Sequence, residues 1–404
     1  FVKTSSDRKK PIEVFDPDIV NIKDLFFTDE PFFPIEEYQT QDYLFKLREL
    51  GMKRSMTGTD LIDRIEKYKS RLCDDEIVSV HNKSFLLLKY IDKNYQDLKD
   101  DILFREKLQT ETWIPTLTPE PDNQRTFSKA SDCRDNLYID LISYTLPIVD
   151  YKIVSDKLRQ SLGWDTIPPT EIVIKQLLHL VNLMNQPRKH SMNNIRNRIN
   201  TNYEHFNKII NQPDGETHLA ILKQNLAKEQ WILNESDDND IYTIDEVVFS
   251  LHNFIPSGYW VQLSRNNRIN YSTLFEKLGV KKTLDIQDFI RVLRNVNFSK
   301  PKQRANIMSI IDELSKSKEE NLTGLLIPNM NCEMVDYKIV LFDDLGSREN
   351  DSMKDFNIIA HSEISKNLAK RLKLENLSEV LLKNSKFDFG QHEQVTTRLK
   401  NILR

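Results

Sequence analysis

One short phrase occurs four times in this chain, and it limits what the chain can fold into. In each copy a stretch with helical spacing ends in Leu-Gly or its equivalent, a short turn follows, and an acidic residue then opens an aliphatic run. The copies are Leu47–Ile65, Leu158–Leu178, Leu274–Leu293 and Leu368–Leu382. A phrase repeated in this way predicts a tandem array, so function has to be sought in a repeated unit rather than in one catalytic pocket.

A second marker precedes each copy at a nearly constant distance. It is a large aromatic or aliphatic residue followed by an aliphatic one, and it stands 46 to 49 residues before the leucine that ends the helical stretch. The four pairs are Phe1-Val2, Trp113-Ile114, Trp231-Ile232 and Leu326-Ile327. These markers predict repeat units over 1–112, 113–230, 231–325 and 326–386, the last of them partial. Units of roughly 100 residues are long enough to bury a small core of their own.

We expect each unit to open with a small two-stranded element, because an aromatic-aliphatic pair followed by proline or polar residues is typical of strands. The expected second strands lie near Phe15, near Phe127, near Tyr242 and within Tyr337–Phe342. Helices fill the rest of each unit, so the predicted fold class is α+β and helix-dominated. The clearest helix is Met192–Ile210, whose apolar residues step by three or four positions. Another is expected over Ser84–Leu108.

The glycine of the repeated phrase predicts a left-handed cap at the end of a helix, since glycine has no Cβ to clash at positive φ. Gly51, Gly163 and Gly279 occupy this place. The fourth copy has Lys373 instead, which predicts a weaker or differently built cap. Gly215, in an Asp-Gly turn, is expected to be less constrained than the cap glycines.

A capping residue three positions before an acid opens the next helix in three of the copies. The pairs are Thr57 with Asp60, Asp285 with Asp288, and Asn376 with Glu379. The second copy has Pro168 before Glu171, and proline suits a first helical turn.

Composition excludes several classes of function. The chain has 57 basic and 61 acidic residues and a net charge of −4, which provides no general attraction to nucleic acid or anionic membranes. Its three cysteines, Cys73, Cys133 and Cys332, stand too far apart for a zinc site or a disulfide framework. Free thiols, without a signal peptide or membrane span, predict a cytoplasmic location.

No pattern in the chain predicts catalysis. The nine glycines include no G-x-G-x-x-G and no phosphate-binding loop, and the eight histidines form no metal-ligand pair. The acidic run 237–240 lacks the glycine and distal glutamate of a calcium loop, so a turn is favoured. We therefore predict that the chain is not an enzyme and has no catalytic, cofactor-binding or metal-binding residue, and no cofactor.

Two further groups of residues are better explained by structure than by binding. The basic cluster 188–190, with Arg196 and Arg198, lacks stacking aromatics on its face, which favours a solvated surface over a nucleic-acid patch. Trp113 and Trp231 have two interpretations, as anchors for a bound peptide or as core residues. Packing is favoured, because each stands at a fixed distance from a cap and large aromatic residues usually hold small cores. His179, on an apolar face, is expected at the edge of a core.

The phrases together resemble the repeat regions of sacsin-like proteins. The segments that carry the resemblance are Gly163–Leu180, Phe275–Lys281 and Phe389–Leu403, and it extends over nearly the whole chain. In that family such units connect ATPase-like domains of the GHKL type, the fold of the ninety-kilodalton heat-shock chaperone. The resemblance implies that 387–404 is the truncated start of such a domain, and that the ATP-binding helix would follow Arg404.

The resemblance also implies a function and partners. It implies a non-catalytic spacer or scaffold of a large chaperone or co-chaperone, which orients ATPase-like domains and contacts client proteins. Implied partners are protein clients or other chaperones, the seventy-kilodalton heat-shock chaperone among them, while the composition predicts no nucleic-acid and no membrane partner. Two alternatives stay open: a fragment of an ATPase whose activity needs a further domain, and an adaptor without any chaperone role.

Overall fold

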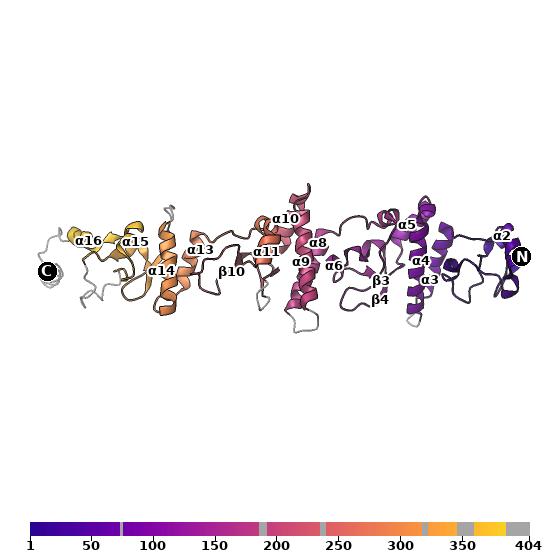
Figure 1. Cartoon of the computed structure of the whole chain (residues 1–404), viewed down its shortest axis with the longest axis horizontal. Helices are drawn as coiled ribbons and strands as arrows, with labels where there is room; N and C mark the ends of the chain where they lie inside the picture. Colours follow the sequence, from indigo (N-terminus) through magenta and orange to yellow (C-terminus); the bar gives the residue numbers. More distant parts are fainter. Residues whose placement is uncertain (73–75, 186–191, 235–239, 317–321, 346–358, 385–404) are drawn as a thin grey trace. The chain divides into compact units, whose positions relative to one another are not determined.

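The computed structural model describes residues 1–72, 76–185, 192–234, 240–316, 322–345 and 359–384 (Figure 1). The chain divides into two compact units, Phe1–Trp231 and Ile232–Arg404. Helices dominate the described part of both units, and the strands are gathered into small sheets. The helix-dominated α+β class is therefore confirmed. None of the described helices is both long and apolar enough to cross a membrane.

The first unit contains ten described α-helices and two described sheets. Its helices are α1 (Val20–Lys23), α2 (Gln41–Glu49), α3 (Gly58–Ser70), α4 (Ile77–Leu98), α5 (Ile102–Thr110), α6 (Ile139–Ile142), α7 (Asp156–Leu162), α8 (Thr170–Met184), α9 (Met192–Ile209) and α10 (Gly215–Leu226). A two-stranded sheet joins β1 (Val2–Lys3) to β2 (Arg8–Lys9). A four-stranded sheet has the order β4 (Arg125–Ser128), β3 (Ile114–Leu117), β6 (Ile148–Val149), β5 (Arg134–Asp135).

The second unit has the same kinds of element. Its described helices are α11 (Arg265–Asn270), α12 (Ser272–Leu278), α13 (Ile286–Asn295), α14 (Pro301–Lys316), α15 (Lys366–Arg371) and α16 (Leu377–Asn384). Its strands pair as β7 (Ile232–Leu233) with β8 (Ile241–Tyr242), β9 (Val247–Val248) with β10 (Val261–Gln262), β11 (Leu326–Pro328) with β12 (Met334–Asp336), and β13 (Leu341–Phe342) with β14 (Glu375–Asn376).

Each aromatic or aliphatic marker begins or directly precedes an antiparallel hairpin, as predicted. The hairpins are β1–β2, β3–β4, β7–β8 and β11–β12, and a short 3₁₀ helix follows each of them. Two of the expected second strands are wrong. Phe15 instead forms an isolated parallel bridge with Lys53, after the first cap. Tyr337–Ile339 is the 3₁₀ helix, because Asp336 accepts a hydrogen bond from the amide of Lys338 and closes a turn there.

The four repeated phrases end their helices with one hydrogen-bond pattern. In each, the amide of the cap residue donates to the carbonyl three residues earlier, and the next amide donates to the carbonyl five residues before it. The cap residues are Gly51, Gly163, Gly279 and Lys373, and all four have positive φ, from 54° to 109°. This is the Schellman arrangement, which satisfies carbonyls that a helix end would otherwise leave without donors.

Lys373 corrects one expectation, because its backbone adopts the left-handed conformation at φ 54° without being glycine. The cap is built in the same way as the others and pays only a conformational penalty, on the order of 1 kcal/mol. Gly215 corrects another, since a Cβ at this position would lie 2.4 Å from the carbonyl oxygen of Ile210. Its constraint is close backbone approach rather than positive φ.

Gly279→Val should lower the free energy of unfolding of the second unit by about 1–3 kcal/mol, because valine is strained at the φ of 109° found there. No atom lies within 4 Å of the added Cβ position, so the loss would come from the backbone and not from a clash. Denaturant unfolding measures it. Thr283→Val, at an exposed site nearby, is the control, and equal stability of the two variants would refute the cap assignment.

The helices after the caps begin largely as predicted. Thr57 with Asp60 and Asp285 with Asp288 form reciprocal capping boxes. Asn376 and Glu379 interact only through their side chains, the Asn376 Nδ2 donating to the Glu379 carboxylate at 2.9 Å. Pro168 lies before α8 rather than in its first turn, and Pro169 is the N-cap without a side-chain hydrogen bond.

The long helices fit the predicted apolar spacing, with one exception. The face of α9 that carries Ile195, Ile199 and Tyr203 is buried. The helix expected over Ser84–Leu108 is two helices, α4 and α5. The break follows from Asp101, whose carboxylate accepts a hydrogen bond from the Phe104 amide and caps a new helix.

Acid should destabilise the first unit through His205 on α9. Burial, followed by the nearby charges of His218 and Lys208, lowers the pKa of His205 from 6.5 to about 4. The unfolded chain then binds more protons than the folded one between these values, so stability falls as the pH falls from about 6.5 towards 4. Relative to His205→Gln, the wild type should lose up to about 3 kcal/mol across this window. Parallel stability–pH curves would contradict this.

Candidate binding cleft in the first unit

The structure accounts for most residues that the sequence singled out, and it gives them structural roles. Trp113 and Trp231 are 3% and 0% exposed, so the packing interpretation is confirmed. The Trp113 indole donates to the carbonyl of Leu108 at 3.1 Å, and Trp231 contacts the Tyr203 ring edge-to-face at 5.7 Å. His179 stacks on Tyr144 at 5.2 Å, at the edge of a core as expected.

The contacts of the marker residues Trp113 and Trp231 differ in part from expectation. Trp113 and Leu162 belong to one buried cluster, as predicted for residues of one unit. However, Trp113 also contacts α5 and Trp231 contacts α9, which both belong to the predicted repeat before them. Trp231 falls in the first compact unit and Leu278 in the second, so their proximity stays a prediction.

Charged residues singled out from the sequence are engaged or lie outside the described residues. Arg198 forms an ion pair with Glu120 at 2.9 Å and lies over the Tyr144 ring at 5.4 Å, which supports a structural role. Residues 73, 188–190, 237–239 and 387–404 lie outside the described residues. Among those described, no three His, Cys, Asp or Glu side chains are grouped to hold a metal ion.

A cleft of about 810 Å³ lies in the first unit, between the loop that follows α1 and one face of α4. The loop contributes Phe27, Thr28 and Phe33, while α4 contributes Asn82 and Leu86. The cleft comes from a sequence feature that we did not single out, the run from Asp24 to Pro34. Two Phe-Phe pairs enclose an acidic pair in this run, and a proline follows the acidic pair and the second Phe-Phe pair.

A buried ion pair holds the loop in shape. Glu30 and Arg64 are 8% and 4% exposed, and one guanidinium nitrogen contacts both carboxylate oxygens at 2.7 and 2.8 Å. The Glu30 carboxylate also accepts a hydrogen bond from the Phe27 amide at 2.7 Å. The Arg64 guanidinium lies over the Phe26 ring, 4.2 Å from its centre. The buried Glu30 carboxylate therefore has both a cationic partner and a backbone hydrogen bond, as burial of a charge requires.

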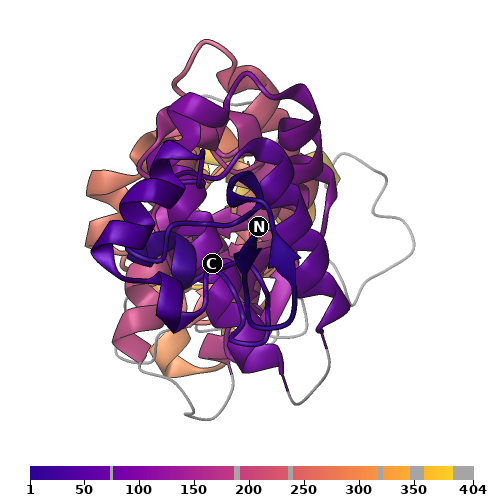
Figure 2. The same cartoon turned by 90° about the vertical axis from the view of Figure 1, so that its right-hand side faces the viewer.

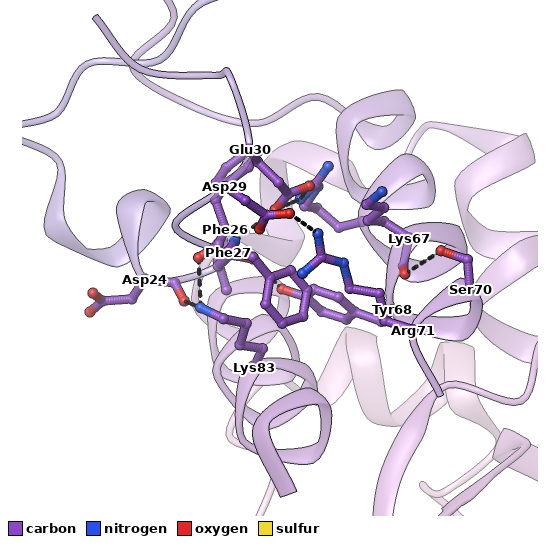
Figure 3. A network of polar contacts seen from close by, with 12 residues as sticks. Asp24, Phe26, Phe27, Asp29, Glu30, Lys67, Tyr68, Ser70, Arg71 and Lys83 are labelled. Carbon is purple, nitrogen blue, oxygen red and sulfur yellow. Dashed lines mark hydrogen bonds and ion pairs between the residues drawn. The ribbon is translucent and has the colours of Figure 1, made fainter. Parts of the chain in front are cut away.

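Two further cations clamp the Phe27 side of the loop (Figure 3). The Lys83 ammonium, on α4, donates to the carbonyls of Asp24 and Phe26 at 3.0 and 2.6 Å. Burial lowers the pKa of Lys83. Arg71, the C-cap residue of α3, lies over the Phe27 ring at 4.1 Å and pairs with Asp29, and its hydrogen bond lowers the pKa of Asp29. The Tyr68 hydroxyl donates to the carbonyl of Leu25 at 2.5 Å.

The cleft thus has a fixed wall and a mixed surface. Two of its charged side chains, Glu30 and Lys83, are engaged with the loop. Half-buried Phe27 and Phe33 and exposed Leu86 provide apolar contact, and exposed Asn82 provides an amide. Clefts of this volume and mixed lining bind small or extended ligands.

Comparison with known proteins finds a related sequence but no solved structure of similar fold. No protein-family model matches the chain, and no solved structure matches it. Human sacsin is 24% identical over 435 aligned residues, which cover 95% of this chain and 9% of sacsin. The chain therefore spans less than a tenth of that protein. The predicted resemblance is confirmed at this level: the chain is similar to sacsin along almost its whole length.

Proposed function

We propose that the chain is a non-catalytic scaffold, built as a tandem array of four related units over 1–112, 113–230, 231–325 and 326–386. The observation that carries this proposal is the Schellman cap, which has the same two hydrogen bonds at four places. Each cap follows a hairpin and a 3₁₀ helix in the same order. One local geometry in the same position of four segments is typical of divergence from a single unit.

Side chains support the relation between the first and third units. Lys53 and Lys281 each stand two residues after the cap glycine of their unit. The ammonium of each lysine contacts the acidic residue of the following capping box at 2.6 Å. Those acids are Asp60 and Asp288. The carbonyl of each lysine also accepts an amide from the segment after the 3₁₀ helix. The lysine therefore connects three parts of its unit in both places.

The role within a larger protein rests on the similarity to sacsin. We propose that the array spaces and orients other domains of a sacsin-like protein, with the segment over 387–404 as the start of an ATPase-like domain. Cytoplasmic location is part of the proposal, and the free thiols of Cys133 and Cys332 support it. A spacer must hold its shape, so small-angle scattering should fit one rigid body. A scattering profile typical of a flexible chain would refute the spacer role.

The cleft beside the Phe-Phe loop is our candidate for contact with clients, either directly or together with a heat-shock chaperone. The chain should slow the aggregation of an unfolded test protein, and Leu86→Asp should weaken this protection. Leu103→Asp is the matched control, because Leu103 is 58% exposed on α5 and does not line the cleft. No protection by the wild type would favour the adaptor alternative, and equal loss in both variants would remove the cleft from the proposal.

The chain should not bind ATP or ADP at micromolar concentrations. Its nine glycines form no phosphate-binding loop, and phosphate binding usually depends on such backbone amides or on a magnesium site. Titration calorimetry measures this, with a chain extended beyond Arg404 for comparison. Stoichiometric micromolar binding by the 404-residue chain would favour the ATPase-fragment alternative.

A further inference from the structure

The leucine before the cap residue is exposed in one copy of the phrase and buried in the other three. Leu162, Leu278 and Leu372 are 4%, 5% and 3% exposed, whereas Leu50 is 63% exposed. The cap hydrogen bonds are the same in all four copies. The difference therefore lies in what covers the leucine and not in how its own helix ends.

Two other apolar residues near the first cap are exposed together with Leu50: Ile12 is 55% exposed and Tyr43 is 49% exposed. Ile12 lies close to the cap, because its Cγ2 is 3.0 Å from the position of a Cβ on Gly51. Tyr43 is seven residues before Leu50, two helical turns away on the same face of α2.

The second copy shows what covers this surface elsewhere. There α5, from the predicted repeat before it, packs against α7. Phe104 and Leu108 of α5 belong to the same buried cluster as Leu162. The Gln109 side-chain amide donates to the carbonyl of Ser161 at 2.5 Å, and the carbonyl of Leu108 accepts the Trp113 indole. One helix thus covers both the marker residue and the cap leucine.

No described residue range supplies such a helix to the first copy. Figure 2 shows the N-terminal end of the first unit, with its small indigo hairpin of β1 and β2 facing the viewer. We call the surface formed by Ile12, Tyr43 and Leu50 the end face. Exposed apolar residues grouped on one face mark interaction sites more often than isolated ones do.

We propose that the end face binds the helical side of another unit of this class, through a helix equivalent to α5. The partner helix would place side chains equivalent to Phe104 and Leu108 over Leu50 and Ile12. An amide equivalent to that of Gln109 would donate to the carbonyl of Glu49, which occupies the place of the Ser161 carbonyl. This inference rests on the proposed array, because the partner is defined by the relation between the copies.

The test places a second copy of residues 1–112 directly before Phe1. Single cysteines at position 50, 154 or 162 are introduced after Cys73 and Cys332 are replaced by serine and Cys133 by alanine. L50C should react quickly with a thiol reagent in the 404-residue chain and at least about tenfold more slowly in the extended chain. L162C gives the rate of a covered site in both chains. V154C, at a residue 79% exposed, should stay fast in both.

Hydrogen exchange on the added copy separates the two proposals. A folded added copy with unchanged reaction of L50C would overturn the end-face inference while leaving the array intact. An added copy without exchange protection would count against the array itself.

A second measurement tests the end-face inference even when the added copy does not fold. A stapled helical peptide of residues 98–112 is titrated into the 404-residue chain with labelled isoleucine and leucine methyl groups. The methyl signals of Ile12 and Leu50 should shift, and L50K should abolish the shift at Ile12. A peptide with Phe104→Ser and Leu108→Ser is the control. Equal shifts with the control peptide, or none with either peptide, would overturn the inference.

Discussion

Replacing Glu30 by alanine should lower the free energy of unfolding of the first unit by about 3–5 kcal/mol, because it leaves the Arg64 guanidinium buried without its carboxylate. Both side chains are less than a tenth exposed. The variant also removes the acceptor for the Phe27 amide, so the wall of the cleft should loosen. Denaturant unfolding gives the stability, and hydrogen exchange of the loop after α1 reports the wall.

Two variants show whether burial is the cause. Asp29→Ala removes a carboxylate whose side chain is 63% exposed, so the loss of stability should be far smaller than that of Glu30→Ala. Adding Arg64→Met to Glu30→Ala should recover part of the loss, since no buried charge then remains. A Glu30→Ala variant no less stable than Asp29→Ala would show that the pair is not buried in solution.

Trp231→Ala should lower the free energy of unfolding by about 3–5 kcal/mol, the usual cost of removing a large buried aromatic side chain. The indole is fully buried, and it lies against Tyr203, whose hydroxyl donates to the carbonyl of Trp231 at 2.6 Å. Exchange protection of α9 should therefore fall together with that of residues near position 231.

The distribution of the loss decides between two arrangements of the units. From the sequence, we expected it to fall mainly on the third repeat. The contact with Tyr203 predicts that α9, in the second repeat, loses protection as well. Protection near the first cap, around Leu47 and Gly51, should stay unchanged. Unchanged protection of α9 would mean that the contact with Tyr203 contributes little to stability.

The features predicted correctly from the sequence are those set by a few neighbouring residues. A helix end needs one residue at positive φ, and glycine after leucine indicates it three times. The capping boxes at Thr57 and Asp285 depend on residues three positions apart. The buried stripe of α9 follows from spacing alone. In each case the physical cause lies within one or two helical turns, so the pattern is readable in a single chain.

The features that were missed depend on contacts between distant residues. Arg64 and Glu30 are 34 positions apart, and no local spacing predicts that the acid in the Phe-Phe loop is buried. Phe15 pairs with Lys53 instead of with the opening strand, because the segment after the cap offers it a parallel partner. Asp101 could have been recognised as a cap, since it precedes an apolar run by one residue.

The hydrogen bond from the Trp113 indole to Leu108 has a consequence for synthesis on the ribosome. The helix that covers this tryptophan ends only a few residues before it, so the cover leaves the ribosome first. Contacts between residues close in sequence form quickly. Each newly made marker residue would then pack on a helix that has already left the ribosome. Folding would keep pace with translation at about 5–20 residues per second. The large buried aromatic residues would then spend little time exposed to aggregation in the nascent chain.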